Sequence, residues 1–368
     1  MSRARQIRKL AERPPRPQVE IRAAEQLLID AIGDMPAGSV LCTSLGRGQF
    51  ATAAARNRPD SAVCCFFLDL YARNLAQQFH SDPPPNVHFD CRTDFPEKEI
   101  DLFALPVTTS GDSEFVREML QLGHMRLRIG GTMFVATDNP TDSWLHDELR
   151  KLFPKVTRRP FKSGTLFAAT KHEPLRKLKN YECQFAFRDE GRLIQVISRP
   201  GVFSHRQVDG GARALLKAMT VQAEAKVLEL GCGSGVVSMA AAMRAEGIQV
   251  WAIDSNARAV ECTRRAAELN GISNVNVELS TAEETRGEQN SESTFDLVVA
   301  NPPYYSNYRI ADIFARAAAQ VLKPEGTALF VTKQSTWYEE QLPQLFRSVV
   351  VERVGNYQIV RCGRKKNR

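Results

Sequence analysis

The sequence contains an internal repeat, and this constrains the fold more than any other feature. Residues 40–55 read VLCTSLGRGQFATAAA and residues 227–242 read VLELGCGSGVVSMAAA, and the two stretches align without a gap. Each is a short apolar run, then glycines, then an alanine-rich helical segment. The match resumes downstream, where FLDLYARNL at residues 67–75 parallels AIDSNARAV at residues 252–260. A repeat on this scale indicates that the chain contains two copies of one kind of domain.

Apolar strand-like runs alternate with helix-like segments in both copies. In the second copy we expect strands at residues 226–230, 249–253, 275–279, 295–300 and 327–332, with helices at residues 257–270 and 310–322. Buried strands that alternate with helices are typical of a parallel sheet covered on both faces. The sequence therefore predicts an α/β chain of two tandem Rossmann-like domains, each with a doubly wound, mostly parallel sheet. A hairpin over residues 185–197, turning at Glu190 and Gly191, is expected to introduce the second copy.

Composition fits two globular domains and excludes several other classes. The 368 residues are 43% hydrophobic and 25% charged, which is too apolar for a disordered chain. The sequence has no apolar run of 18 residues, and residues 1–22 lack the apolar centre of a signal peptide. None of the eight cysteines forms a C-x-x-C pair. We therefore expect no membrane segment, no metal site and a cytoplasmic location.

Basic charge is concentrated in three segments. The net charge of the chain is +7. Residues 1–22 carry a net charge of +5, residues 155–179 carry +7 and residues 361–368 carry +5, so the rest of the chain has a net charge of −10. Basic tails are often only solvating. Clustered basic charge on an acidic body nevertheless favours a phosphate-rich partner such as nucleic acid.

A glycine-rich loop in the second copy follows a predicted strand and precedes a predicted helix. It reads ELGCGSG, from Glu229 through Gly231 and Gly233 to Gly235, and Asp254 ends the next strand. Glycines there allow a sharp turn and close approach to a ligand, and Asp254 can accept the two hydroxyls of a ribose. The anionic Glu229 would repel a pyrophosphate and suits a cationic cofactor. The alternative is a tight turn that binds nothing, and Cys232 within it is expected to be a small loop residue rather than a nucleophile.

A second motif, NPPY at Asn301, Pro302, Pro303 and Tyr304, ends the fourth predicted strand. Ligands bind at this carboxyl edge in sheets of the expected kind. The Asn301 side-chain oxygen and the Pro302 carbonyl could both accept from one exocyclic amino group, and Tyr304 offers a flat face to a planar substrate. Held this way, the nitrogen lone pair would point at an electrophile, which is catalysis by positioning. The alternative is a rigid loop around two prolines.

Together these two motifs resemble the class I S-adenosylmethionine-dependent methyltransferases. The resemblance implies S-adenosyl-L-methionine as cofactor, with Gly231, Gly233 and Gly235 near its methionyl part, Asp254 at its ribose and Ala282 beside its adenine. The NPPY motif is similar to that of methyltransferases acting on planar nitrogens. These are the N2 group of guanine, the N6 group of adenine and the amide of a protein glutamine.

The rest of the chain resembles the bacterial ribosomal RNA guanine-N2 methyltransferases. The similar segments are RPGVFS at residues 199–204, DGG at residues 209–211 and GNYQIVR at residues 355–361, and that family also carries a degenerate domain before an active one. The resemblance implies methylation of guanine N2 in ribosomal RNA or a ribosomal subunit, with Phe203 and Ser204 beside the cofactor or target base. We expect a basic tail at residues 1–22, a degenerate RNA-binding domain at 23–170, a basic linker at 171–181 and a catalytic domain at 182–368. His205 is expected to be a solvated loop residue.

The first copy lacks the acidic loop residue and the NPPY motif to which cofactor binding and catalysis are assigned in the second copy. Cys42 stands at the acidic position of its loop, and residues 106–109 read PVTT where the second copy has NPPY. Asp69 survives and is interpreted as a vestige. We therefore expect the first domain and the basic segments to hold RNA, while the second domain holds the cofactor. The alternatives are an adenine-N6 or protein-glutamine methyltransferase and a non-catalytic RNA-binding assembly factor.

Overall fold

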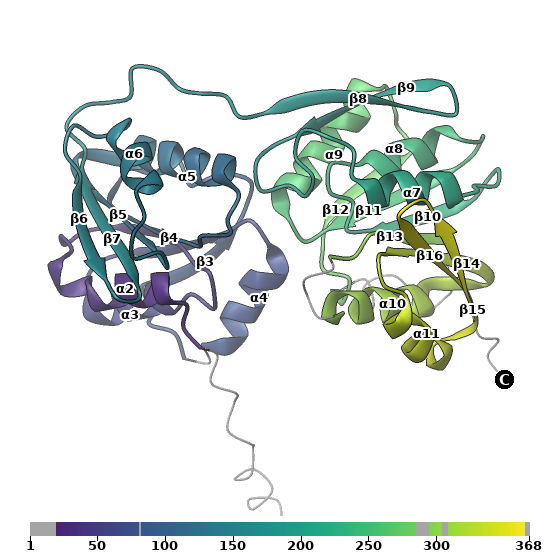
Figure 1. Cartoon of the computed structure of the whole chain (residues 1–368), viewed down its shortest axis with the longest axis horizontal. Coiled ribbons are helices and arrows are strands. Elements are labelled where there is room, and N and C mark those ends of the chain that lie inside the picture. Colours follow the sequence, from purple (N-terminus) through teal and green to yellow (C-terminus); the bar gives the residue numbers. More distant parts are fainter. Residues whose placement is uncertain (1–19, 81, 285–293, 304–307, 365–368) are drawn as a thin grey trace, which may run out of the picture.

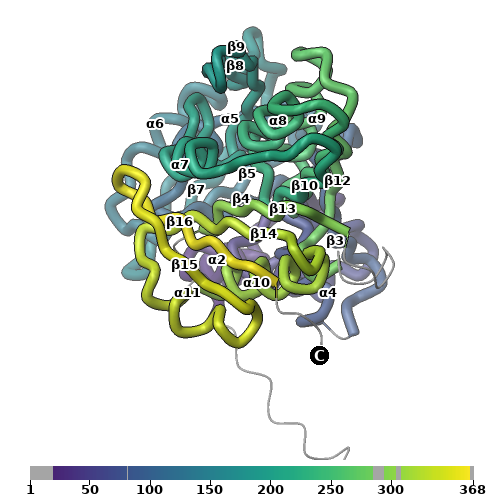
Figure 2. The backbone as a smooth tube through the Cα atoms, turned by 90° about the vertical axis from the view of Figure 1, so that its right-hand side faces the viewer, coloured from purple at the N-terminus to yellow at the C-terminus, as the bar shows by residue number. Residues whose placement is uncertain are grey.

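The computed structural model describes residues 20–80, 82–284, 294–303 and 308–364. Two α/β lobes lie side by side, and an extended segment connects the first to a hairpin at the start of the second (Figure 1). We call the part from α2 to β7 the first lobe and the part from β8 to β16 the second lobe. Seen from the side of the second lobe, that hairpin lies at one end of the molecule (Figure 2).

The first lobe contains a seven-stranded sheet with strand order β3-β2-β1-β4-β5-β7-β6. Its strands are β1 (Val40–Thr43), β2 (Val63–Phe67), β3 (Val87–Cys91), β4 (Ile100–Val107), β5 (Leu127–Thr137), β6 (Thr157–Phe161) and β7 (Gly164–Thr170). Its helices are α2 (Ala23–Asp30), η1 (Ile32–Asp34), α3 (Gln49–Asn57), α4 (Leu70–Phe79), α5 (Ser113–Arg126) and α6 (Trp144–Arg150).

The second lobe repeats this arrangement in the order β12-β11-β10-β13-β14-β16-β15. Its strands are β10 (Lys226–Leu230), β11 (Gln249–Asp254), β12 (Val275–Leu279), β13 (Phe295–Ala300), β14 (Leu322–Thr332), β15 (Phe346–Val354) and β16 (Tyr357–Arg364). Its helices are α7 (Gly210–Ala218), α8 (Val236–Met243), α9 (Ala257–Leu269), α10 (Arg309–Val321), α11 (Thr336–Gln341) and η4 (Leu342–Gln344). The hairpin that precedes them pairs β8 (Cys183–Asp189) with β9 (Arg192–Ser198).

The predicted duplication and fold class are confirmed. Val40 pairs with Leu102 in the first sheet, and its counterpart Val227 pairs with Leu297 in the second. In each sheet only the pairings that involve β7 or β16 are antiparallel. The start of β14 differs from expectation, since the strand begins at Leu322 and not at residue 327. The chain passes directly from α10 into β14, and a bulge then shifts the pairing register with β13.

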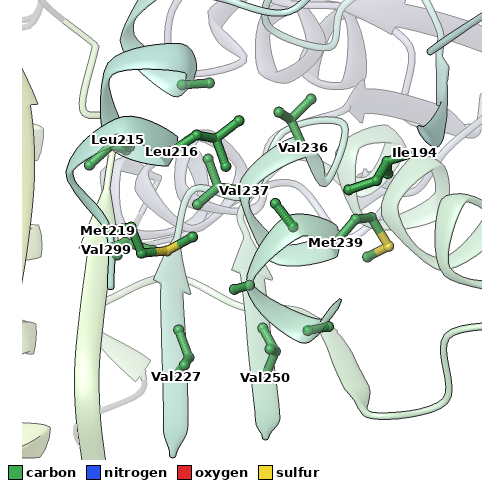
Figure 3. Packing of buried hydrophobic residues seen from close by; sticks show 14 of the residues in the cluster. Ile194, Leu215, Leu216, Met219, Val227, Val236, Val237, Met239, Val250 and Val299 are labelled. Carbon is green, nitrogen blue, oxygen red and sulfur yellow. The ribbon is translucent and has the colours of Figure 1, made fainter. Parts of the chain in front are cut away.

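Helices α7 and α8 cover one face of the second sheet. Leu215, Leu216 and Met219 from α7 and its end meet Val237 and Met239 of α8 above Val227 and Val250 of the strands (Figure 3). Close packing of this kind leaves the helices little room to shift. The packing therefore fixes the loop between β10 and α8, which carries the glycines.

The two lobes meet through equivalent parts of the repeat. The amide of Leu70 donates to the Ser255 carbonyl at 2.7 Å, and the amide of Ala257 donates to the Leu68 carbonyl at 2.8 Å. Leu70 and Ser255 occupy matching positions in the aligned stretches 67–75 and 252–260. The ends of β2 and β11 thus face each other across the junction.

Candidate active site

A cavity of about 560 Å³ lies at the carboxyl ends of β10, β11 and β13 and extends to the junction with the first lobe. The predicted residues Glu229, Gly231, Gly233, Asp254, Ala282, Phe203, Asn301 and Pro303 all line it. Its wall also contains Asp69, Tyr71 and Asp112 from the first lobe. The fold therefore brings the two sequence motifs to one site, and it adds residues that the motifs did not indicate.

The glycine loop is shaped by three left-handed residues. Gly231, Gly233 and Gly235 have φ values of 77°, 58° and 82°, a region that other residues rarely adopt. A Cβ on Gly233 would meet no atom within 4 Å, so its backbone faces open space. Gly235 does not line the cavity, and a Cβ there would lie 2.9 Å from Thr263. The structure thus gives Gly235 a packing role between α8 and α9.

Glu229 is a buried carboxyl and Asp254 is a half-buried one, and both lie at the carboxyl ends of their strands. Each Asp254 oxygen accepts a backbone amide, from Gly233 at 2.8 Å and from Asn256 at 2.8 Å. Burial raises the pKa of Asp254 to about 6 and that of Glu229 to about 8, and the Glu229 carboxylate accepts the Ser238 hydroxyl. Near pH 7 Asp254 is therefore mostly ionised and Glu229 mostly protonated, and a cation that enters the cavity favours the ionised form of both.

The charged side chains on the cavity wall are all acidic among the described residues. Asp69, Asp112, Asp209, Glu229, Asp254 and Glu283 line it, and among the described residues no lysine, arginine or histidine does. This charge favours a cationic ligand and disfavours phosphate groups inside the cavity. The preference for a cationic cofactor, which the sequence predicts from Glu229 alone, is therefore supported by the other charged residues of the wall.

Asn301 is oriented by a carboxylate that we did not assign to the site from the sequence. The Asn301 Nδ2 atom donates to Asp209 Oδ2 at 2.8 Å, and the same oxygen accepts the amide of Gly211 at 2.7 Å at the start of α7. Because an amide nitrogen must face a carboxylate, this bond also fixes the direction of the Asn301 oxygen. Pro302 is buried and does not line the cavity, and Tyr304 lies outside the described residues.

Gly211 permits this arrangement by lacking a side chain. A Cβ at this position would lie 2.8 Å from both Asn301 Oδ1 and Asp209 Oδ2. We expect Gly211→Ala to lower the rate of methyl transfer about 100-fold through displacement of the Asn301 amide. Single-turnover assays would measure the loss, and titration should show cofactor affinity within twofold of wild type. An unchanged rate would show that the amide position does not matter.

Two further predicted residues flank the cavity at different depths. Phe203 lines it yet is 55% exposed, which places an aromatic ring at the mouth. Ala282 is buried and lines the wall beside Thr281, where the loop after β12 turns. A ring at the mouth suits contact with a base that enters from outside, whereas the wall near Ala282 suits a buried ligand.

The structure supports the expectation that Cys232 is not a nucleophile, but it does not support the expectation that His205 is solvated. Cys232 is buried against Thr263, and burial raises the pKa of its thiol well above the usual value, so it is not a reactive thiolate. His205 was expected to be solvated, but its side chain is only 7% exposed. Its Nδ1 atom lies 2.9 Å from Ser198 Oγ and its Nε2 atom 3.5 Å from Glu114, so it is part of the contact between the lobes.

The corresponding loop of the first lobe is occupied by a side chain of its own domain. The buried Glu25 carboxylate of α2 accepts bonds from the Ser44 hydroxyl and from the amides of Leu45 and Phe50. Ser44 and Leu45 belong to the loop that corresponds to the glycine loop of the second lobe, and Phe50 lies in the first turn of the helix that follows it, α3. An internal acid thus takes the donors that a ligand would need, which gives a physical reason for the expected loss of chemistry in this copy.

The structure shows neither a membrane span nor a metal centre in the part it describes. No helix there is long and apolar enough to cross a bilayer. Over the same residues, no group of three or more histidine, cysteine, aspartate or glutamate side chains could hold a metal ion.

Sequence comparison finds similarity to methyltransferases over the second lobe and beyond. Residues 193–361 match the methyltransferase small domain family. Ribosomal RNA small subunit methyltransferase C of Salmonella arizonae is 27% identical over 203 residues, covering 54% of this chain and 56% of that protein. The protein of that name from Escherichia coli O1:K1 / APEC is 24% identical over 243 residues, covering 64% of this chain and 68% of that protein. The chain thus matches about half to two thirds of the length of these curated relatives.

A solved structure covers almost the whole chain. The T. thermophilus 16S rRNA N2 G1207 methyltransferase, determined in complex with AdoMet and guanosine, superposes with a TM-score of 0.78 at 20% identity. The match includes 95% of this chain and 93% of that one, so the two-lobe architecture is shared. Residues 193–361 therefore match the methyltransferase small domain family, the chain is similar in sequence to ribosomal RNA small subunit methyltransferase C, and it has the two-lobe fold of the solved methyltransferase.

Proposed function

We propose that the chain transfers a methyl group from S-adenosylmethionine to the exocyclic N2 amino group of a guanine in ribosomal RNA. The observation that carries this proposal is a cavity in which an acidic glycine loop adjoins Asn301, whose amide is oriented by Asp209. The resemblance to a methyltransferase determined with AdoMet and guanosine supports both the cofactor and the base. The relatives named for ribosomal RNA support the substrate class.

The residues present fit S-adenosylmethionine. Six carboxyl groups line the cavity without a basic side chain among the described residues, which matches a ligand with ammonium and sulfonium charges. Glu229 and the glycine loop would hold the methionyl part, Asp254 the ribose, and Ala282 the adenine. When bound, the cofactor supplies a methyl group on a strongly electrophilic sulfur.

The acceptor side of the site needs no general base before transfer. The Asn301 oxygen would accept from the guanine amino group and hold its lone pair toward the methyl group, and the nitrogen would lose a proton after the transfer. Phe203 at the cavity mouth offers a surface against which a base taken out of its stack can lie. The acidic wall keeps phosphates outside, so only the base would enter.

We assign RNA binding to the first domain, residues 23–170, and to the basic segments, with catalysis in residues 182–368 and a cytoplasmic location. Seven of the eight basic residues between 155 and 179 are exposed, among them Arg158, Arg159 and Lys162 around the edge strand β6. Lys171 is the exception. It is buried, and its ammonium group donates to the Leu127 carbonyl at 2.6 Å, so it stabilises the first lobe and does not contact RNA.

A transfer assay tests the substrate class. Purified chain is incubated with S-adenosylmethionine labelled in its methyl group and with ribosomal RNA or subunits from a strain that lacks the gene. We expect label in RNA, and we expect it to be lost with Asn301→Ala. Label found only in protein would favour the glutamine alternative, and absence of transfer to every fraction would favour the non-catalytic one.

Cofactor affinity is expected to depend on pH. Asp254 must be ionised to accept ribose hydroxyls, and its pKa in the free protein is about 6, so binding weakens as pH falls through this value. We expect affinity for S-adenosylmethionine to be about tenfold lower at pH 5 than at pH 7 from this group alone. Isothermal titration calorimetry at both pH values would measure it. In Asp254→Asn the difference should shrink, and a flat profile in the wild type would contradict the assignment.

A further inference from the structure

The carboxylate that orients Asn301 has a second oxygen at the acceptor end of the cavity. Asp209 is half-buried, lies directly before α7 and lines the cavity together with Asn301. Its Oδ2 atom accepts the amides of Gly211 at 2.7 Å and Ala212 at 3.2 Å, and it accepts Asn301 Nδ2 at 2.8 Å. Its Oδ1 atom accepts no hydrogen bond from the residues that the structure describes. An acceptor with spare capacity at the wall of a cavity suits a ligand that brings a donor.

The bonds to Oδ2 decide which oxygen of Asp209 remains for a ligand. All three come from N–H groups, two of them in the first turn of α7 and one on the side chain that ends β13. Because these donors hold the carboxylate in one orientation, Oδ1 is the oxygen that a ligand can reach. Asp209 and Asn301 thus offer two acceptors, Oδ1 of the carboxylate and the amide oxygen to which the target amino group is assigned.

Two acceptors distinguish guanine from the other planar nitrogen substrates. Guanine carries an N1–H donor directly beside its N2 amino group, so its Watson–Crick edge presents neighbouring donors. Adenine carries an acceptor, N1, beside its N6 amino group, and a glutamine amide carries its carbonyl oxygen beside its NH2 group. A carboxylate oxygen can only accept a hydrogen bond. Oδ1 would therefore bond to guanine, whereas the lone pair of adenine N1 or of a glutamine carbonyl would repel it.

We propose that Asp209 Oδ1 accepts the N1–H of the target guanine while the Asn301 oxygen accepts from its N2 amino group. This inference rests on the proposed function and names the residue that selects guanine over adenine and glutamine. The two oxygens of Asp209 then have different tasks, since Oδ2 orients Asn301 and Oδ1 contacts the base. Because N1 and N2 belong to one rigid base, the two residues hold it as a unit.

The variant Asp209→Asn separates these two tasks. Its side-chain oxygen must face the amides of Gly211 and Ala212 and the Asn301 Nδ2 atom, because a second NH2 group there would meet three donors. Its NH2 group then takes the place of Oδ1 and faces the base with a donor. Asparagine is as good as aspartate at the start of a helix, so α7 and the orientation of Asn301 are kept.

A change of base at the target position tests the contact with N1. The substrates are RNA containing the guanine that the wild type methylates and the same RNA with 2-aminopurine at that position. The analogue keeps the amino group, but its N1 atom is an acceptor. We expect the ratio of single-turnover rates, guanine over 2-aminopurine, to fall about 100-fold in Asp209→Asn relative to wild type. Comparing ratios cancels the effect of the missing O6 atom, since both proteins receive the same two RNAs.

Asp112→Asn is the matched control. Asp112 is another carboxylate of the cavity wall, and it also precedes a helix, where it accepts the Glu114 amide at 2.9 Å. The change removes one negative charge from the same wall without altering the partner of Asn301. We expect its ratio of rates to stay within twofold of wild type. An equal fall in both variants would overturn the inference, because the charge of the wall and not a contact with N1 would then set the preference.

The remaining outcomes separate this inference from the proposed function. If the wild type methylates no guanine in RNA, the proposed function fails. If it does, and the ratio of rates is the same in wild type and Asp209→Asn, only the contact between Asp209 and N1 is overturned. Loss of transfer to both RNAs in Asp209→Asn, with the affinity for S-adenosylmethionine within twofold of wild type by calorimetry, would overturn it as well.

Discussion

Replacing Asn301 with alanine is expected to lower the rate of methyl transfer by about 10³-fold or more while leaving cofactor affinity within twofold of wild type. The side-chain oxygen is the group proposed to hold the guanine amino group, and removal of one such preorganised partner costs about 10²- to 10³-fold. The loss of orientation adds to this. Single-turnover transfer at saturating cofactor measures the rate, and calorimetric titration measures the affinity.

Asp209 provides the comparison for this variant. Asp209→Ala removes the carboxylate that receives Asn301 Nδ2 at 2.8 Å, but it keeps the amide itself. We expect a smaller loss of rate than for Asn301→Ala, and the double variant should be no slower than Asn301→Ala because the two residues act as a unit. Independent, additive losses would contradict the proposal that Asp209 acts through Asn301.

Replacing Arg258 with alanine is expected to destabilise the protein by about 3–5 kcal/mol. Arg258 is fully buried between the lobes, where it donates to Glu118, to the Thr93 carbonyl at 2.8 Å and to the Pro200 carbonyl at 2.7 Å. Its removal leaves Glu118 as a buried charge whose remaining ion-pair partner, among the described residues, is Arg199 at 3.7 Å. Chemical denaturation monitored by circular dichroism would measure the change in the free energy of unfolding.

Arg265 is a suitable control because it lies on the same helix. It pairs with Glu182, the residue directly before β8, and both side chains are partly exposed. Arg265→Ala should cost less than about 1 kcal/mol, as exposed ion pairs usually do. Equal losses for the two variants would show that the junction between the lobes is not the stabilising feature.

Much of the fold follows from local sequence. The strand at residues 226–230 and the helix that begins at residue 257 match the structure, because apolar runs and a side-chain cap define them without reference to distant residues. The hairpin turn at Glu190 and Gly191 is likewise local. Because the two copies share one sequence pattern, the repeat also predicts that both sheets have the same strand order, as they do.

The part of the site that was not predicted depends on contacts between distant segments. Tyr71 and Asp69 reach the cavity only because the two lobes dock through the ends of β2 and β11. Glu25 fills the loop of the first copy from a helix about 20 residues upstream, as its bond to Leu45 shows. These residues are far apart in the sequence, so no motif with a fixed spacing predicts that they meet in the fold.

Burial is equally hard to predict for polar residues. Lys171 belongs to a basic segment by composition, yet its aliphatic chain is buried and its ammonium group bonds to main-chain carbonyls. His205 lies in a turn beside left-handed Ser204 and Arg206, a context that predicts solvent exposure. Its burial arises from the opposite lobe, through Glu114.

The identity of the methylated nucleoside tests the central proposal most directly. Ribosomal RNA from a strain lacking the gene is treated with the purified chain and S-adenosylmethionine, digested to nucleosides and separated by chromatography with mass detection. The proposal predicts a gain of N2-methylguanosine that depends on Asn301. A gain of N6-methyladenosine instead, or an unchanged nucleoside profile with RNA and subunits alike, would contradict it.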